Sequence, residues 1–88
     1  MSLPSPRFIL GMARGELQSV VGENLRAYRQ ARGINQEDLA YRLGLHRTYM
    51  SDIERGKRNL SLQTIEQFAE LLDLEPLSLL TPPPTSQE

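Results

Sequence analysis

Three glycines divide the middle of this chain into short segments, and they constrain its fold more than any other feature. Gly33, Gly44 and Gly56 each follow a stretch in which apolar residues recur at spacings of three and four. Such spacing marks one face of an α-helix, and glycine readily takes the left-handed conformation that often follows a helix end. The pattern predicts short helices joined by tight turns.

Five helices are expected from this pattern and from the residues that begin the segments. Asn35 and Ser61 are suitable N-caps, and Pro76 suits a first helical position. The expected ranges are about 19–32, 36–43, 47 to the break at Gly56, 62–73 and 76–80. The residues expected to face inward are Val21, Leu25, Tyr28, Leu39, Ala40, Leu43, Leu45, Met50, Ile53, Leu62, Ile65, Phe68, Ala69 and Leu72.

The helical segments lie between two ends of different composition. Residues 1–15 hold two prolines, two glycines and no clear period, so they are expected to form a flexible N-terminal arm. Residues 82–88 have the composition of a disordered, proline-rich tail. The fold class is therefore all-α, with one compact five-helix domain over residues 16–81. Its second and third helices, joined by about three residues that include a glycine, predict a helix-turn-helix whose second helix can enter a DNA major groove.

The charge is distributed unevenly along the chain. The whole chain of 88 residues has a net charge of −1, but residues 26–58 carry eight basic and four acidic side chains. Residues 61–88 carry five acidic side chains and no basic one. Such a chain can present one basic surface to a polyanion although its net charge is slightly negative. The alternative is a solvated surface of uneven charge with no partner.

Several classes of protein are excluded by the residues that are present. The chain has no cysteine, so a disulfide framework, a zinc finger and a thiol nucleophile are impossible. No nucleophile–base pair, carboxylate dyad or phosphate loop can be assembled, so we predict neither an enzyme nor a cofactor site. The apolar runs are far too short to cross a membrane. The expected location is the cytoplasm.

Polar residues of the predicted third helix have no evident role inside the domain. Residues three and four apart share a helix face, so these side chains fall opposite the apolar stripe or at the leading end of the helix. Arginine can bond guanine bidentately, and hydroxyl groups can reach bases or phosphates. We therefore predict that Arg47, Thr48, Ser51 and Asp52 read base edges. Asp52 can accept from cytosine or, alternatively, hold Arg55 or Arg47 in place.

Two further residues of this region call for their own explanation. His46 is the only histidine, so no metal site can be completed around it, and it is expected to cap the third helix or to touch phosphate. Glu54 would repel phosphate unless a cation neutralised it inside the protein. Arg29, on the first helix, is the candidate partner for a structural ion pair with Glu54.

The segment QEDLAYRLGLHRTYMSDIERGKRN resembles the helix-turn-helix of the Xre and phage-repressor family. The resemblance covers about residues 19–80 and implies a repressor-like DNA-binding domain. The narrower stretch HRTYMSDIERGKRNLSL is similar to controller proteins of restriction-modification systems, which are small homodimeric regulators of their own operon. The N-terminal arm is longer than is usual in controllers, and the proline-rich tail is additional, so the regulated operon stays open.

The resemblance also implies roles for individual residues. The family's glutamine at the start of the second helix holds a phosphate and supports the recognition helix, and Gln36 matches it. The family's arginine–glutamate pair matches Arg29 and Glu54. The controllers' DNA contacts match Arg47, Thr48, Tyr49, Ser51, Arg58 and Asn59. Phosphate contacts are thus expected from Gln36, His46, Tyr49, Arg55, Lys57, Arg58 and Asn59.

Double-stranded DNA is the expected partner, and selective binding requires two copies on half-sites about 34 Å apart. The fifth helix and the residues before it carry clustered leucines that can form a homodimer interface, namely Leu74, Leu77, Leu79 and Leu80. Alternatively, these leucines only close the core. A rival function is that of a protein-interaction module such as an antitoxin, whose partner would contact the arm or the leucine surface.

Overall fold

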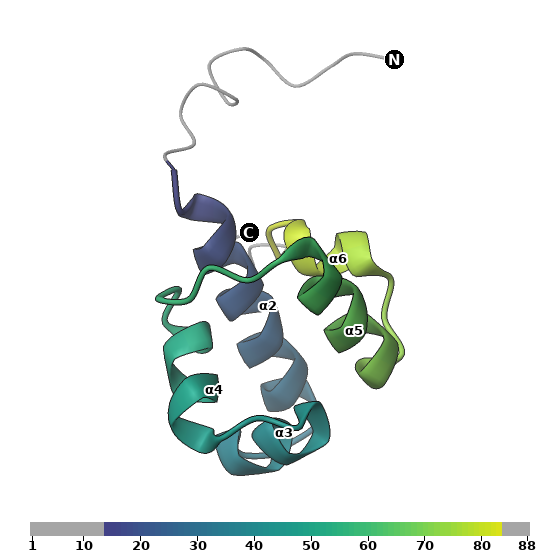
Figure 1. Ribbon diagram of the computed structural model, residues 1–88. Helices are drawn as coiled ribbons and strands as arrows, with labels where there is room; N and C mark the ends of the chain where they lie inside the picture. The colour runs from purple at the N-terminus through teal and green to yellow at the C-terminus, as the bar shows by residue number, and fades with distance from the viewer. Residues whose placement is uncertain (1–13, 84–88) are drawn as a thin grey trace, which may run out of the picture.

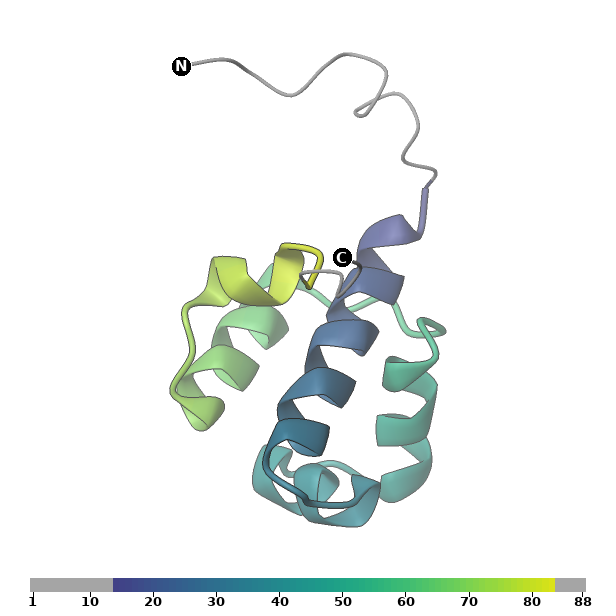
Figure 2. The same ribbon diagram turned by 180° about the vertical axis from the view of Figure 1, so that it is seen from behind.

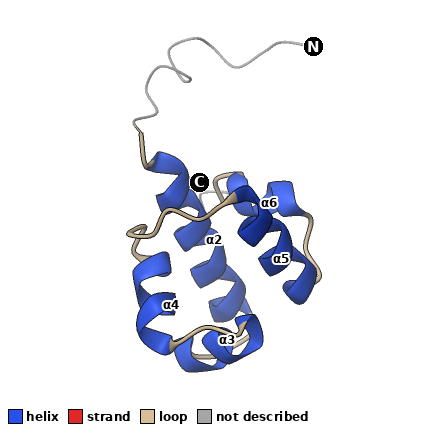
Figure 3. Cartoon of the chain, viewed as in Figure 1, coloured by secondary structure: helices blue, strands red, loops and turns tan. Residues whose placement is uncertain are grey.

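The computed structural model describes residues 14–83. Within this range all regular secondary structure is helical (Figure 3). The helices are α2 (Glu16–Ala31), α3 (Gln36–Leu43), α4 (Arg47–Glu54), α5 (Leu62–Leu72) and α6 (Pro76–Leu80). The predicted all-α fold of five helices is confirmed. The predictions of an N-terminal arm and a C-terminal tail fall almost wholly on residues 1–13 and 84–88, which lie outside the described residues.

Side-chain caps fix where two of the helices begin. Asn35 Oδ1 accepts the backbone N–H of Asp38 at 2.8 Å, and Asp38 Oδ2 accepts the N–H of Asn35 at 3.4 Å. This reciprocal pair satisfies donors that the first turn of α3 leaves free. Ser61 Oγ accepts the N–H of Thr64 at 3.0 Å and so caps α5. The N-caps predicted at Asn35 and Ser61 are confirmed.

A glycine makes the sharp turn between α3 and α4. Gly44 has φ of 71°, a left-handed conformation that strains most other residues. With this geometry the N–H of Leu45 donates to the carbonyl of Ala40 at 2.8 Å, and the last turn of α3 is closed. Only three residues therefore separate α3 from α4.

The long helix α2 runs through the middle of the molecule (Figure 1). It contacts α4 along one side and α6 along the other, while α3 contacts both α4 and α5. Figure 2 shows the same order from behind, with α3 at the base. The first helix begins at Glu16, about three residues earlier than predicted, after Gly15 in a left-handed conformation. None of the helices in the described part of the chain is long and apolar enough to span a membrane.

The core lies where the five helices face one another. Its fully buried members are Val21, Leu25, Leu39, Ala40, Leu43, Met50, Ile53, Ile65, Phe68, Ala69, Leu72 and Leu79, and Tyr28 and Leu45 pack against them partly buried. Leu62 was expected in this set, but it is 74% exposed. It is the first residue of α5 and lies at the edge of the molecule, where its helical spacing from Ile65 does not bring it under another helix. The prediction of an inward-facing Leu62 is wrong.

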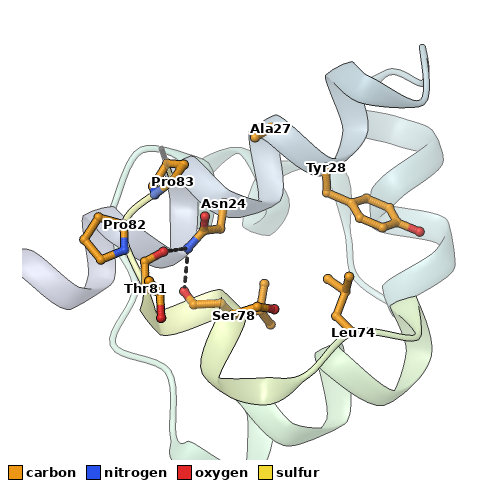
Figure 4. A pocket seen from close by; sticks show the side chains of 9 residues that line it. Asn24, Ala27, Tyr28, Leu74, Ser78, Thr81, Pro82 and Pro83 are labelled. Atoms are coloured by element: carbon orange, nitrogen blue, oxygen red, sulfur yellow. Dashed lines mark hydrogen bonds between the residues drawn. The ribbon is translucent and has the colours of Figure 1, made fainter. Parts of the chain in front are cut away.

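The end of α6 is fastened to α2 by one side chain. Asn24 Nδ2 donates to the carbonyls of Leu79 at 2.9 Å and Thr81 at 2.8 Å (Figure 4). Beside these bonds a cavity of about 520 Å³ opens between α2 and α6, and Tyr28 and Leu74 form part of its wall. Leu79 itself is only 1% exposed. Leu79 therefore closes the monomer core, the alternative role expected for these leucines, and it was also predicted at the dimer interface.

Candidate nucleic-acid interface

The leading end of α4 is an exposed helix N-terminus with its own cap. His46 is the N-cap, and its Nδ1 accepts the backbone N–H of Thr48 at 3.1 Å. A ring nitrogen that accepts a hydrogen bond leaves the other, Nε2, as the N–H donor of the neutral ring. The His46 side chain is itself exposed, as are Arg47 and Thr48. A helix N-terminus of this kind favours negatively charged groups such as phosphate.

The two faces of α4 differ in how far their side chains are buried. Met50 and Ile53 are buried in the core. Arg47 and Thr48 are exposed, and Ser51 is half-buried. Three of the four predicted base-reading residues thus lie at the leading end or on the outward side of α4, where Arg47 and Thr48 are exposed and Ser51 is partly covered.

The fourth, Asp52, is engaged with two arginines. Its carboxylate accepts from Arg55 Nη2 at 3.1 Å, and from Arg58 Nη2 at 3.0 Å and Nε at 3.2 Å. These hydrogen bonds, first from Arg55 and then from Arg58, hold the pKa of Asp52 below its usual value. The expected contact with Arg55 is present, and the second arginine held by Asp52 is Arg58 rather than Arg47.

The end of α4 and the loop after it carry exposed cations and one exposed amide. Arg55, Lys57, Arg58 and Asn59 are all exposed. The guanidinium of Arg58 lies 4.7 Å from the centre of the Tyr49 ring, so Asp52 and Tyr49 together orient it. Gln18 Nε2 also donates to the carbonyl of Gly56 at 3.2 Å and ties the loop to α2. No local sequence pattern marks this contact, because its two residues lie 38 positions apart.

A buried carboxylate joins three helices behind this surface. The Glu54 side chain is 1% exposed, and its Oε2 accepts from Arg29 Nε at 2.7 Å. Its Oε1 accepts from Arg29 Nη2 at 3.1 Å and from Gln36 Nε2 at 3.0 Å. The bond to Glu54 raises the pKa of Arg29. The structure therefore brings together Arg29 on α2, Gln36 on α3 and Glu54 on α4.

Arg26 is a further cation at this carboxylate that sequence reasoning missed. Its Nε lies 3.9 Å from Glu54 Oε1, and its Nη2 donates to the Glu54 carbonyl at 3.4 Å. The spacing of three residues between Arg26 and Arg29 was the available signal, because such residues share a helix face. With two arginines around it, the Glu54 charge is balanced inside the protein.

The predicted leucine patch is only partly on the surface. Leu77 is 73% exposed, while Leu74 and Leu80 are half-buried and pack against the core.

Across residues 14–83, no group of three or more histidines, cysteines, aspartates or glutamates is placed to hold a metal ion.

Comparison with known proteins identifies the family of this chain. The sequence model of a helix-turn-helix domain matches residues 20–80. The chain belongs to this helix-turn-helix family. The control protein C.BamHI of Bacillus amyloliquefaciens is 43% identical over 65 residues, which is 73% of this chain and 80% of that protein. The predicted resemblance to Xre-like regulators and restriction-modification controllers is confirmed.

Solved structures of controllers have the same fold. The controller C.AhdI of Aeromonas hydrophila is 45% identical, with a TM-score of 0.62 over 70% of this chain and 94% of that one. The controller C.Esp1396I, solved as a tetramer with its natural 35-base-pair operator, is 38% identical, with a TM-score of 0.61 over 72% of this chain and 83% of that one. The protein is thus a DNA-binding transcriptional regulator related to controllers, in a family of transcription factors rather than enzymes.

Proposed function

We propose that this protein binds a (pseudo)palindromic operator as a sequence-specific homodimer and regulates a restriction-modification operon in the cytoplasm. The observation that carries the proposal is the leading end of α4, where Arg47 and Thr48 project beside an exposed, capped helix N-terminus. This end has donors for base edges and a dipole that attracts phosphate. The operator complex of the related C.Esp1396I supports DNA as the partner.

The site residues divide into two groups with different tasks. Arg47, Thr48 and Ser51 read base edges, with Asp52 joining them where a cytosine lies in reach. The phosphate contacts fix the position of the helix and come from Gln36, His46, Tyr49, Arg55, Lys57, Arg58 and Asn59. Gln36 can serve both the fold and the DNA, since its amide nitrogen has two hydrogens and Glu54 takes only one of them.

The internal neutralisation of Glu54 supports this assignment. A free carboxylate at the end of a recognition helix would repel the phosphate backbone. Between them, Arg29 and Gln36 donate to both carboxylate oxygens of Glu54, and the Glu54 side chain is shielded from solvent. The electrostatic potential at the α4 surface is therefore determined by the exposed cations of α4 and of the loop that follows it.

In-vitro selection from random duplex DNA at about 150 mM salt, where phosphate contacts still contribute to binding, tests the proposal. We expect enrichment of a two-fold symmetric motif whose half-sites lie about 10 base pairs apart. A match to that motif upstream of the protein's own gene would support the controller assignment. Failure to enrich any sequence would contradict DNA recognition and favour a protein partner instead.

Arg47→Ala and Lys57→Ala are expected to change DNA binding in different ways. Arg47→Ala should cost about 1–3 kcal/mol on the selected site and relax discrimination at one base pair. Lys57→Ala should weaken binding to all sequences and reduce the salt slope by about one. Titrations of both variants at several salt concentrations measure the difference. An unchanged salt slope for Lys57→Ala would remove Lys57 from the phosphate contacts.

Leu77→Asp is expected to weaken dimerisation and operator binding together. Leu77 is the exposed member of the predicted patch, so a charge there should not disturb the monomer core but would be desolvated in a dimer. Light scattering gives the oligomeric state, and Glu75→Ala, an exposed neighbour, is the matched control. A Leu77→Asp variant that stays dimeric would exclude this interface.

A further inference from the structure

An apolar groove lies at the end of the molecule where α2 begins. It has a volume of about 390 Å³ and runs between the first turn of α2, the loop before α5 and the end of α6. Val21 and Ile65, both buried, lie among its lining residues, and Leu60 and Leu80 are half-buried in its wall. This groove is separate from the cavity between α2 and α6 shown in Figure 4.

Two leucines at this groove are left exposed by the described part of the chain. Leu17 is 50% exposed and Leu62 is 74% exposed, although both line the groove. They come from elements far apart in the sequence, α2 and α5. An apolar groove edged by exposed leucines and polar residues is the usual form of a surface that another segment covers.

The chain itself provides a segment of matching chemistry at this place. Arg14 and Gly15, the first described residues, line the groove. The six residues Arg7 to Met12 read RFILGM, with four large apolar side chains and no acid. Phe8 precedes Arg14 by six residues, so the chain length keeps it within about 20 Å of the groove's edge. A segment tethered so closely has an effective concentration of about millimolar and outcompetes most free partners.

We propose that the groove is the docking site of this chain's own N-terminal segment, with Phe8, Ile9 and Leu10 covering Leu17 and Leu62. Gly15 has φ of 95°, and this left-handed residue turns the chain where it enters α2. The groove also includes Arg58 and Asn59 in its lining. A docked segment therefore holds the loop that carries these two polar side chains. The inference does not depend on DNA binding and would stand if the proposed function failed.

Paramagnetic broadening in the full chain tests the docking directly. The chain has no cysteine, so Ser5→Cys provides one attachment point for a nitroxide label. We expect loss of the methyl signals of Leu60 and Leu62, which are far from the label in sequence, and their recovery when the nitroxide is reduced. The matched control is a label at Glu37→Cys, exposed on α3, which should spare these signals. In the Ser5-labelled chain, Phe8→Ser with Ile9→Ser should restore the signals.

A mixed sample separates the chain's own segment from that of a second copy. Isotope-labelled chains without nitroxide are mixed with nitroxide-labelled chains without isotope, so that only contacts between copies broaden signals. Undiminished methyl signals in the mixture, with loss in the doubly labelled chain, support docking within one chain. Equal loss in both samples would overturn it in favour of exchange between copies, and full signals in both would overturn docking altogether.

Discussion

Arg29→Ala is expected to lower the free energy of unfolding by about 3–5 kcal/mol, because it leaves a buried carboxylate without its main partner. Glu54 is 1% exposed on its side chain, and Arg29 supplies two of the hydrogen bonds that it accepts. Small domains have a total stability of about 5–15 kcal/mol, so a large share of it would be lost. Urea denaturation followed by circular dichroism measures the change.

Two further variants separate the buried ion pair from a simple loss of charge. Arg32 lies at the end of the same helix, and its guanidinium stacks on the Tyr28 ring at 3.8 Å. Arg32→Ala should lower the free energy of unfolding by about 1 kcal/mol or less. Arg29→Met combined with Glu54→Met should be more stable than Arg29→Ala alone, since no buried charge remains. Equal losses for Arg29→Ala and Arg32→Ala would contradict a special role for the pair.

Helix boundaries were the part of the fold that could be predicted from sequence most closely, because local chemistry sets them. The range predicted for α3 agrees with the structure, as does that for α6. Asn35 satisfies free N–H groups at the start of α3 through its own side chain, and Gly44 ends the helix through its own backbone. Such interactions involve residues only a few positions apart and are visible in the sequence.

Burial at the edges of the domain could not be predicted in the same way. Leu62 and Ile65 share a helix face by spacing, but only Ile65 lies beneath neighbouring helices. Leu79 and Leu77 both belong to an apolar segment, and the rotation of α6 against α2 decides which one is buried. Periodicity specifies a face of a helix, whereas the extent of its cover depends on the tertiary arrangement.

In the candidate site, too, the local features could be predicted from the sequence and the tertiary contacts could not. The need to neutralise Glu54 was predictable from charge alone and led to Arg29. Gln36 was expected to hold a phosphate and to support the recognition helix, but its bond to Glu54 was not predicted because it depends on how closely α3 approaches α4. The two tethers of Arg58, to Asp52 and Tyr49, likewise arise from the path of the loop after α4.

Gly22→Ala is expected to destabilise the fold by about 1–3 kcal/mol or more, through overpacking between α2 and α4. A methyl group at Gly22 would collide with the carbonyl oxygen of Ile53 and would lie 2.7 Å from that of Glu54. Both obstacles are backbone atoms of α4, so no side-chain rotation relieves them. In an exposed helix the same substitution would instead stabilise by about 1 kcal/mol, so the sign of the change is informative.

The effect on DNA binding should exceed the loss of folded protein, because the collision acts on the recognition helix itself. Pushing the end of α4 away from α2 tilts its leading end, which carries Arg47 and Thr48, and strains the bonds between Arg29 and Glu54. Operator affinity measured at a temperature where Gly22→Ala is fully folded isolates this part. Glu23→Ala, an exposed neighbour, should change stability by no more than about 0.5 kcal/mol. A Gly22→Ala protein more stable than wild type would show that α2 and α4 do not meet this closely.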